Sequence, residues 1–304
     1  MPVFLVIMLG LAIRRAGLIG SSTATQMTNI VFKVAMPVKL FTDVSMSDFS
    51  QMLDFMFIAF TAGSVIVFFL ICFLIAEKFI QDTKKKGAFV QGSFRGNYVI
   101  LGATLIPAIL GYTPALAATA VIITVTLFNV LSVIALTING DRGQEQKSAL
   151  VSILRSIATN PLIIGIFFGI LYSLAPFRMP LVLDSSVNIV SALASPLALI
   201  VIGANLDFTS LKERFKLSLV AGFLKLIVMP LMFLPLAIWL GMSSEAIIVL
   251  FVLYCAPTAI VSYVMAASMG SDEHLAANII LVTSMISIFT YTIGVFILRA
   301  INII

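Results

Sequence analysis

The chain has little charge, and its apolar stretches contain almost none. Only 10% of its 304 residues are charged, 61% are hydrophobic, and the mean hydropathy is +1.17. Because a soluble domain carries roughly 25% charged residues, we expect an integral membrane protein. The 18 Lys and Arg residues exceed the 13 Asp and Glu residues, but they lie in short loops between apolar runs. This placement is typical of membrane orientation and does not indicate nucleic-acid binding.

Residues and motifs of common enzyme sites are also missing. The two cysteines, Cys72 and Cys255, fall inside apolar runs and are predicted to be packed thiols. The sequence has no His/Cys/Asp cluster with metal spacing, no P-loop and no Gly-x-Ser-x-Gly. The single histidine, His274, is predicted to be a helix-end residue. We therefore expect neither an enzyme nor an ATP-driven pump, and no metal or cofactor.

Ten apolar windows are long enough, or nearly so, to span a membrane, which needs about 20 residues. The first is short, which would fit a few residues missing at the N-terminus, and Arg14 and Arg15 follow it. A signal peptide has its charge before the apolar region, so no cleavable signal is predicted. The expected fold is an all-α integral membrane protein with ten transmembrane helices at residues 2–19, 26–45, 52–76, 88–110, 114–138, 151–174, 180–206, 216–240, 245–269 and 274–301.

The loops predict the orientation, because basic residues concentrate in cytoplasmic loops. The loops after spans one, three, five and seven are basic, whereas the alternate loops are mostly acidic. Both termini are therefore expected outside a plasma or inner cell membrane. The basic loops contain Arg14, Arg15, Lys84, Lys85, Lys86, Arg142, Lys147, Lys212 and Arg214.

An internal repeat appears when the sequence is shifted by 159 positions. Each half, residues 1–150 and 151–304, would hold five spans, and an odd number gives the halves opposite topology. Inverted repeats of this kind are typical of secondary transporters, whose sites lie where broken helices meet. The matched pairs include Pro2 with Pro161, Gly10 with Gly169, Pro37 with Pro196, and Asp48-Phe49 with Asp207-Phe208.

Two spans combine polar residues with helix breakers, which are costly in lipid and usually line a cavity. Span four reads SFRGNYVILGATLIPAILG, and span nine contains the run CAPTA. A mid-span proline frees a carbonyl, and two crossing breaks would expose helix N-termini that attract anions. The predicted substrate-binding residues here are Asn97, Tyr98, Thr104, Pro107, Cys255, Pro257, Thr258 and Ser262.

These motifs resemble the auxin efflux carrier family, which includes plant auxin carriers and bacterial dicarboxylate carriers. The resemblance rests on Arg95-Gly96-Asn97-Tyr98, the turn at Gly102, the Cys255–Ala259 run and Ser195-Pro196-Leu197. It covers essentially the whole chain.

The resemblance implies two inverted five-helix repeats in which spans four and nine cross. Spans 1, 2, 6 and 7 would form a scaffold that often dimerises, and spans 3–5 and 8–10 a transport domain with elevator-like movement. The substrate-binding asparagine would be Asn97, and the second crossover proline Pro257. The family's Gly-x-Pro is replaced by Gly102-Ala103-Thr104, with Pro107 further on. The break in span four is therefore predicted at Thr104 or Pro107.

Further polar residues lie in other spans. Lys225 in span eight either faces the substrate cavity or extends to the cytoplasmic interface, and the sequence leaves both open. Asn129 in span five is a candidate for lining the cavity from behind the crossing. Lys39, beside Pro37 in span two, either faces the substrate path of the scaffold or extends to the interface, and extension is the favoured reading.

The function predicted from these features is secondary or facilitative transport of a small organic anion, either a dicarboxylate or an auxin-like weak acid. The expected partners are this anion, membrane lipid and a second copy of the chain. One alternative is a sodium-coupled organic anion symporter of the bile-acid-transporter type, although the acidic ligand usual in such a site is missing. A membrane sensor without a transport cycle is a third possibility, which no appended domain supports.

Overall fold

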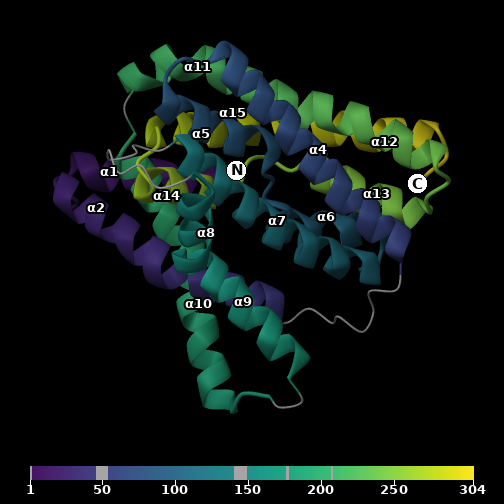
Figure 1. Ribbon diagram of the computed structural model, residues 1–304, viewed down its shortest axis with the longest axis horizontal. Helices are drawn as coiled ribbons and strands as arrows, with labels where there is room; N and C mark the ends of the chain where they lie inside the picture. Colours follow the sequence, from purple (N-terminus) through teal and green to yellow (C-terminus); the bar gives the residue numbers. More distant parts are fainter. Residues whose placement is uncertain (1, 46–53, 140–148, 176–177, 207) are drawn as a thin grey trace.

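The computed structural model describes the chain except for residues 1, 46–53, 140–148, 176–177 and 207 (Figure 1). It is 85% helical. Within the described residues there are no strands, and one isolated antiparallel bridge joins Gly96 to Thr258. The predictions that involve Asp48-Phe49, Arg142, Lys147 and Asp207 fall outside the described residues.

The first half of the chain forms helices that break at glycine or at short polar turns. Helix α1 ends at two arginines, and a turn follows in which Gly17 has a φ of 76°, a conformation that favours glycine. The helices are α1 (Pro2–Arg15), α2 (Ser21–Ile30), the π-helical segment η1 (Val31–Ala35), α3 (Met36–Ser45), α4 (Phe55–Phe79), α5 (Thr83–Phe94), α6 (Tyr98–Leu110) and α7 (Ala115–Asn139).

The second half begins at α8 and ends in the longest helix of the described chain. A π-helical segment again interrupts one helical run, here between α11 and α12. The elements are α8 (Ala149–Thr159), α9 (Pro161–Leu174), α10 (Leu181–Ala204), α11 (Phe208–Phe223), η3 (Leu224–Val228), α12 (Met229–Trp239), α13 (Ser244–Tyr254), α14 (Val261–Ser268) and α15 (Glu273–Ala300).

Several helices are long and apolar enough to cross a membrane. The described chain contains five of them, or six if one bent pair counts as a single span. The five are residues 55–79, 115–139, 181–204, 212–239 and 273–300, close to five of the ten predicted windows. Each of the predicted spans 88–110 and 245–269 is interrupted. The first is divided into α5 and α6, and the second into α13 and α14. The chain is therefore a multi-pass membrane protein.

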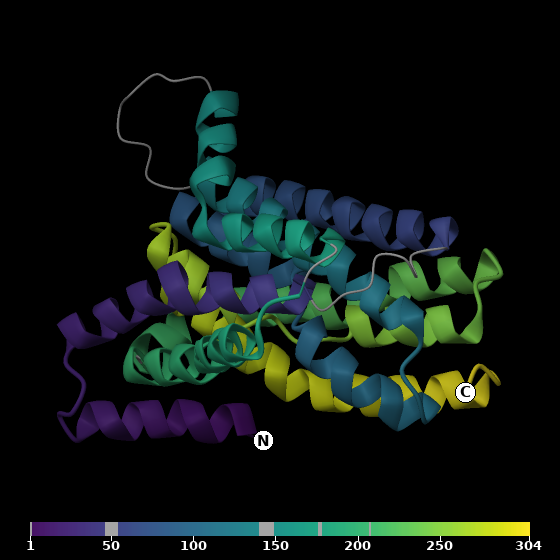
Figure 2. The same cartoon turned by 90° about the horizontal axis from the view of Figure 1, so that it is seen from below.

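The predicted span 151–174 is bent, because α8 and α9 meet at an angle of 62°. The Asn160-Pro161 pair causes the bend. A residue before proline is disfavoured in the helical conformation, and Asn160 is extended, with a ψ of 122°. Its side chain caps α9 by accepting a hydrogen bond from the Leu162 N–H at 2.9 Å. Figure 2 shows α8 turned away from α9.

The buried apolar side chains form two large clusters. One draws only on α4–α7, α11–α15 and the η3 segment. The other joins α1, η1, α3, α9 and α10 to the inner sides of α7, α14 and α15. In Figure 1, α9 and α10 project on one side, and α4, α11 and α12 run along the opposite side. The core is thus divided between two groups of helices.

Glycines allow very close helix packing within the second cluster. A Cβ at Gly10 of α1 would collide with the carbonyl oxygen of Ile200 in α10. A Cβ at Gly169 of α9 would lie 2.9 Å from the carbonyl oxygen of Phe41 in α3. Small residues commonly serve this purpose where membrane helices meet.

Candidate functional site

The first helix interruption lies at residues 95–97, between α5 and α6. Arg95 is extended, with a φ of −82° and a ψ of 123°. At Gly96, an added Cβ would lie 3.1 Å from the Ala256 Cβ and 3.3 Å from the Leu253 carbonyl oxygen. Glycine avoids the crowding that a Cβ would cause where these two segments of the chain approach each other. Asn97 then forms the N-cap of α6.

The prediction that span four breaks at Thr104 or Pro107 is wrong, because both residues lie inside α6. The exposed Thr104 hydroxyl donates to the carbonyl oxygens of Ile100 and Leu101, each at 3.2 Å, so it bonds to its own helix. Pro107 lacks an N–H, but the helix continues to Leu110. Neither residue exposes a helix end.

The second interruption lies at residues 255–260, between α13 and α14, and it contains Cys255, Pro257 and Thr258. This is the location that the proline predicted. We call residues 95–97 and 255–260 together the crossing. Backbone groups join its two arms: the Asn97 N–H donates to the Pro257 carbonyl oxygen at 2.8 Å. The two interruptions therefore lie directly against each other.

Side chains reinforce this contact. The Thr258 hydroxyl donates to the Gly92 carbonyl oxygen at 2.7 Å, and its N–H donates to the Thr283 hydroxyl at 3.1 Å. The Gln91 amide donates to the Ser262 carbonyl oxygen at 2.8 Å. The Gln91 Oε1 and Ser262 Oγ atoms are buried and have no hydrogen-bond partner in the described structure. Unused polar groups therefore lie next to the crossing, in α5 and α14.

Lys225 lies beside the crossing and is completely buried. Its Nζ donates to the carbonyl oxygens of Tyr254 at 3.0 Å and Leu253 at 3.4 Å, and it lies 3.4 Å from the Met229 sulfur. Those two carbonyls belong to the last turn of α13, the end that favours a positive charge. Of the two readings left open by the sequence, extension to the interface is excluded in this structure.

Arg95 is a second buried cation, and sequence reasoning did not include it in the site. It is only 3% exposed. Its Nη2 donates to the Asn129 Oδ1 at 3.0 Å, and its Nη1 lies 2.8 Å from the Met265 sulfur and 3.4 Å from the Ser132 hydroxyl. Asn129 is fully engaged here, because its Nδ2 also donates to the Val125 carbonyl oxygen at 2.7 Å. The sequence feature that could have identified Arg95 as a site residue is its position beside Gly96, in an otherwise apolar span.

Asn97 differs from these residues in having an unused side chain. Its amide does not cap α6 and makes no hydrogen bond within the part of the chain that the structure describes. It is half-buried at the N-terminus of α6. Backbone N–H groups and the helix dipole make such a terminus favourable for an anion.

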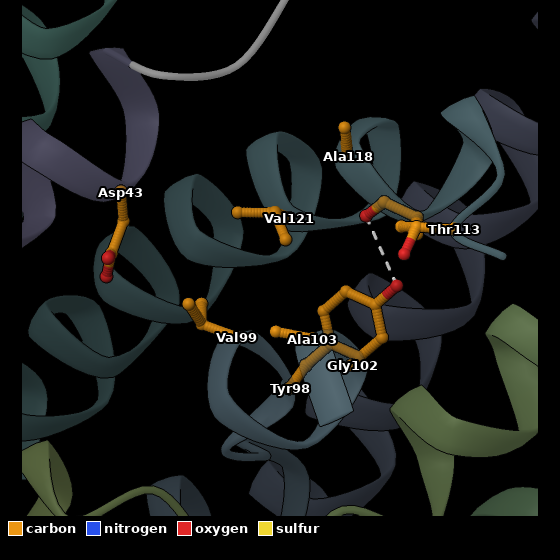
Figure 3. A pocket seen from close by; sticks show the side chains of 9 residues that line it. Asp43, Tyr98, Val99, Gly102, Ala103, Thr113, Ala118 and Val121 are labelled. Atoms are coloured by element: carbon orange, nitrogen blue, oxygen red, sulfur yellow. Dashed lines mark hydrogen bonds between the residues drawn. The ribbon is translucent and has the colours of Figure 1, made fainter. Parts of the chain in front are cut away.

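A cavity of about 290 Å³ lies between α3, α6 and α7 (Figure 3). Tyr98, the residue after Asn97, lines it and donates its hydroxyl to the Ala117 carbonyl oxygen at 3.2 Å. Asp43 also lines the cavity and pairs with Lys39 at 3.0 Å. Lys39 therefore has an acidic partner one turn further along its own helix.

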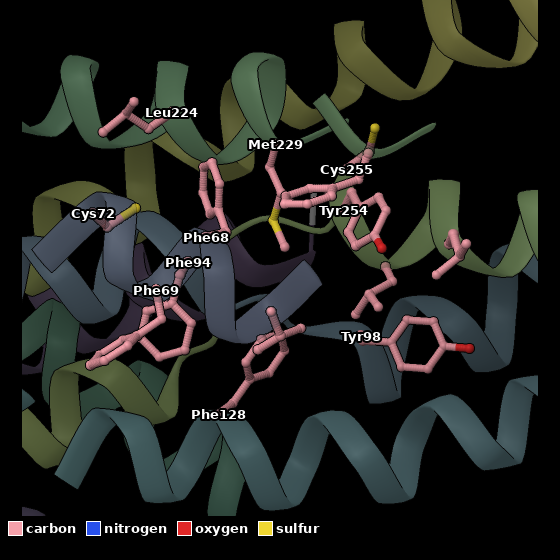
Figure 4. Close-up of a cluster of buried hydrophobic side chains, with 14 of the residues drawn as sticks. Phe68, Phe69, Cys72, Phe94, Tyr98, Phe128, Leu224, Met229, Tyr254 and Cys255 are labelled. Atoms are coloured by element: carbon pink, nitrogen blue, oxygen red, sulfur yellow. The ribbon is translucent and has the colours of Figure 1, made fainter. Parts of the chain in front are cut away.

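Apolar side chains surround the crossing. Cys255 and Cys72 are both buried free thiols in the cluster shown in Figure 4, as the sequence predicted. The Tyr254 hydroxyl lies 2.7 Å from the Ser64 hydroxyl in the same region.

A second contact joins α6 and α13 at the ends that lie away from the crossing. There the Tyr112 hydroxyl donates to the Glu245 carboxylate, and this bond raises the pKa of Tyr112. The half-helices are thus tied together at both ends.

The crossing therefore combines two helix N-termini, an unused amide and two buried cations in an apolar surrounding. Such a set can hold a carboxylate. Within the described residues, no group of three or more His, Cys, Asp or Glu side chains is placed to bind a metal ion.

A fold of several apolar helices with a polar crossing defines a membrane transport protein. Residues 1–295 match the family described as “Membrane transport protein”, and the chain belongs to this family, which is that of the auxin efflux carriers. A protein of Rhizobium meliloti (strain 1021) named “Putative malonate transporter” is 28% identical to the chain over 310 residues. That alignment covers 99% of this chain and 95% of the relative.

Proposed function

We propose that this protein carries a small organic anion, a dicarboxylate or an auxin-like weak acid, and binds it at the crossing. The observation that carries the proposal is the free Asn97 amide at the N-terminus of α6. Lys225 and Arg95 supply positive charge nearby, and Pro257 and Thr258 lie directly against this arm of the crossing. Tyr98, Cys255 and Ser262 are the other proposed binding residues. The malonate named for the Rhizobium relative is an anion of this class.

The proposed architecture has ten spans in two inverted repeats, residues 1–150 and 151–304. One pair of helix contacts supports it. Gly10 packs against Ile200, and Gly169 packs against Phe41. Under the 159-residue shift, 10 + 159 = 169 and 41 + 159 = 200, so each contact becomes the other with the halves exchanged. This exchange is expected of a pseudo-two-fold relation.

The proposed mechanism is alternating access of the elevator type. The division of the core supports it, because one apolar cluster draws only on the predicted spans 3–5 and 8–10 and includes Cys255 of the second interruption. Spans 1, 2, 6 and 7 would form the fixed scaffold, and a second copy would pack against it in a homodimer surrounded by lipid. Both termini would lie outside a plasma or inner cell membrane, because the basic loops favour the cytoplasm.

The sodium-coupled alternative has one observation in its favour. The buried Gln91 Oε1 and Ser262 Oγ atoms are unused acceptors at the crossing, and a sodium ion binds such oxygens. Uptake into proteoliposomes in sodium buffer and in N-methylglucamine buffer tests it. A rate that does not change when sodium is replaced excludes sodium coupling.

Malonate uptake by purified protein in proteoliposomes tests the carrier proposal. Wild-type protein is expected to accumulate labelled malonate above protein-free vesicles, and excess unlabelled malonate should compete. A sensor without a transport cycle would bind malonate and show no counterflow. Absence of uptake for malonate and for indole-3-acetate, with folded protein in the vesicles, would reject the proposal.

A further inference from the structure

Two buried basic side chains belong to, or lie against, the first arm of the crossing. Arg95 is 3% exposed and Lys225 is 0% exposed. Gly96 separates them: it follows Arg95 in the chain, and a Cβ placed on it would lie 3.2 Å from the Lys225 Nζ. Asn97, the proposed carboxylate ligand, is the next residue. Both cations therefore border the proposed binding position.

All hydrogen-bond partners of the two cations are neutral. Arg95 contacts an amide oxygen, a hydroxyl and a thioether, and Lys225 contacts two backbone carbonyls and a thioether. The ion pairs of the described chain involve other residues: Lys39 with Asp43, Lys85 with Asp82, Lys86 with Glu77, and Arg214 with Glu213 and Asp272. The crossing thus holds two positive charges and no described carboxylate to balance them.

Buried charges without counter-charges are costly in a membrane protein, and they usually mark the path of a substrate. We infer that Arg95 is a specificity-determining residue that acts with Lys225 to select a doubly charged dicarboxylate over a monocarboxylate. The inference rests on the proposed function and specifies its substrate class. A dianion at Asn97 would balance both charges, whereas a monoanion would leave one uncompensated.

Arg95 acts through its charge. It is nearly enclosed by α7 and α14, so its guanidinium influences the anion across the low-dielectric interior. A purely structural Arg95 would tie α5 to α7 and α14 and would affect every substrate equally. The two roles therefore differ in one measurable quantity, the ratio of uptake rates for substrates of the same shape and different charge.

Malonate and its monoamide form such a pair, since replacing one carboxylate by an amide removes one charge and changes the shape little. Initial uptake rates of both at pH 7 would be measured for wild type, Arg95→Gln and Arg95→Lys. Lys85→Gln is the matched control, because Lys85 is a basic residue in a surface ion pair with Asp82 at 3.4 Å. Size-exclusion profiles and thermal melting report the folding of each variant.

We expect wild type to prefer malonate, and Arg95→Gln to lower the malonate-to-monoamide ratio about tenfold, because the attraction between one buried charge and the second carboxylate is lost. Arg95→Lys, which keeps the charge, and Lys85→Gln should keep the ratio. An Arg95→Gln variant that slows both substrates in the same proportion would overturn the inference. A malonate-to-monoamide ratio near one in wild-type protein would also overturn the inference, and this measurement does not depend on the folding of Arg95→Gln. Wild-type protein that transports neither of these anions nor indole-3-acetate would reject the proposed function itself, whereas uptake of indole-3-acetate alone would overturn only the inference about Arg95.

Discussion

Replacing Lys225 by methionine separates the transport role of the buried charge from its structural role. Methionine has nearly the same length and fits an apolar surrounding, so the change removes the charge and its hydrogen bonds with little change in volume. The bonds lost are those to the carbonyl oxygens of Tyr254 and Leu253. Leaving two buried acceptors unpaired costs about 1–3 kcal/mol each.

A second effect opposes this loss. A lysine at the centre of a membrane helix costs about 2.5–3.5 kcal/mol on insertion scales, and methionine avoids that cost. Two lost bonds cost about 2–6 kcal/mol in total, so the net change in stability should be at most a few kcal/mol and is smaller than for a typical core truncation to alanine. Malonate uptake should nevertheless fall about tenfold or more, because one of the two compensating charges is gone.

The assay compares the melting temperature of purified protein with the initial malonate uptake rate in proteoliposomes. Lys216→Met is the matched control, since Lys216 lies nine residues before Lys225 in the same helical run and is exposed. If the folded Lys225→Met variant takes up malonate at the wild-type rate, the role of this charge in transport is refuted. A loss of uptake that only follows a large loss of stability would show that Lys225 is structural.

Two further substitutions test the geometry of the crossing. Gly96→Ala places a Cβ 3.1 Å from the Ala256 Cβ and 3.3 Å from the Leu253 carbonyl oxygen. We therefore expect chemical unfolding to show about 1–3 kcal/mol of destabilisation. Unchanged stability would mean that the arms lie further apart. Thr258→Val removes the hydrogen bond to the Gly92 carbonyl oxygen and should lower the free energy of unfolding by about 1–3 kcal/mol. Thr292→Val is the control: it loses an exposed hydrogen bond within its own helix and should change stability by less than about 0.5 kcal/mol. Equal effects of the two threonine substitutions would contradict the contact.

The second interruption could be predicted because Pro257 stands in the middle of an apolar run and breaks it unambiguously. The first could not be located in the same way. Thr104 and Pro107 are the stronger breaking signals in the sequence, but the helix accommodates both within α6. Gly96 is decisive because another part of the chain approaches it, and Ala256 and Leu253 are distant in sequence. Such a tertiary contact leaves no local signal.

The long apolar helices were predictable, because length and composition decide them. The bend at Asn160 was not predicted, although the Asn-Pro pair is a boundary signal, because the surrounding run is continuous and apolar. The burial of Lys225 and Arg95 depends on neighbours from α7, α13 and α14, which the sequence alone does not bring together.

The most direct test of the carrier proposal is malonate uptake by Asn97→Ala in proteoliposomes. The Asn97 amide makes no hydrogen bond within the described structure, so its removal should leave the melting temperature nearly unchanged. If this amide binds the substrate carboxylate, a lost hydrogen bond to a charged group of about 1.5–3 kcal/mol predicts uptake reduced about 10- to 150-fold. Asn188→Ala, which removes an exposed asparagine bonded to Asp184, should transport like wild type. A folded Asn97→Ala variant that takes up malonate at the wild-type rate would contradict the binding of the substrate by Asn97.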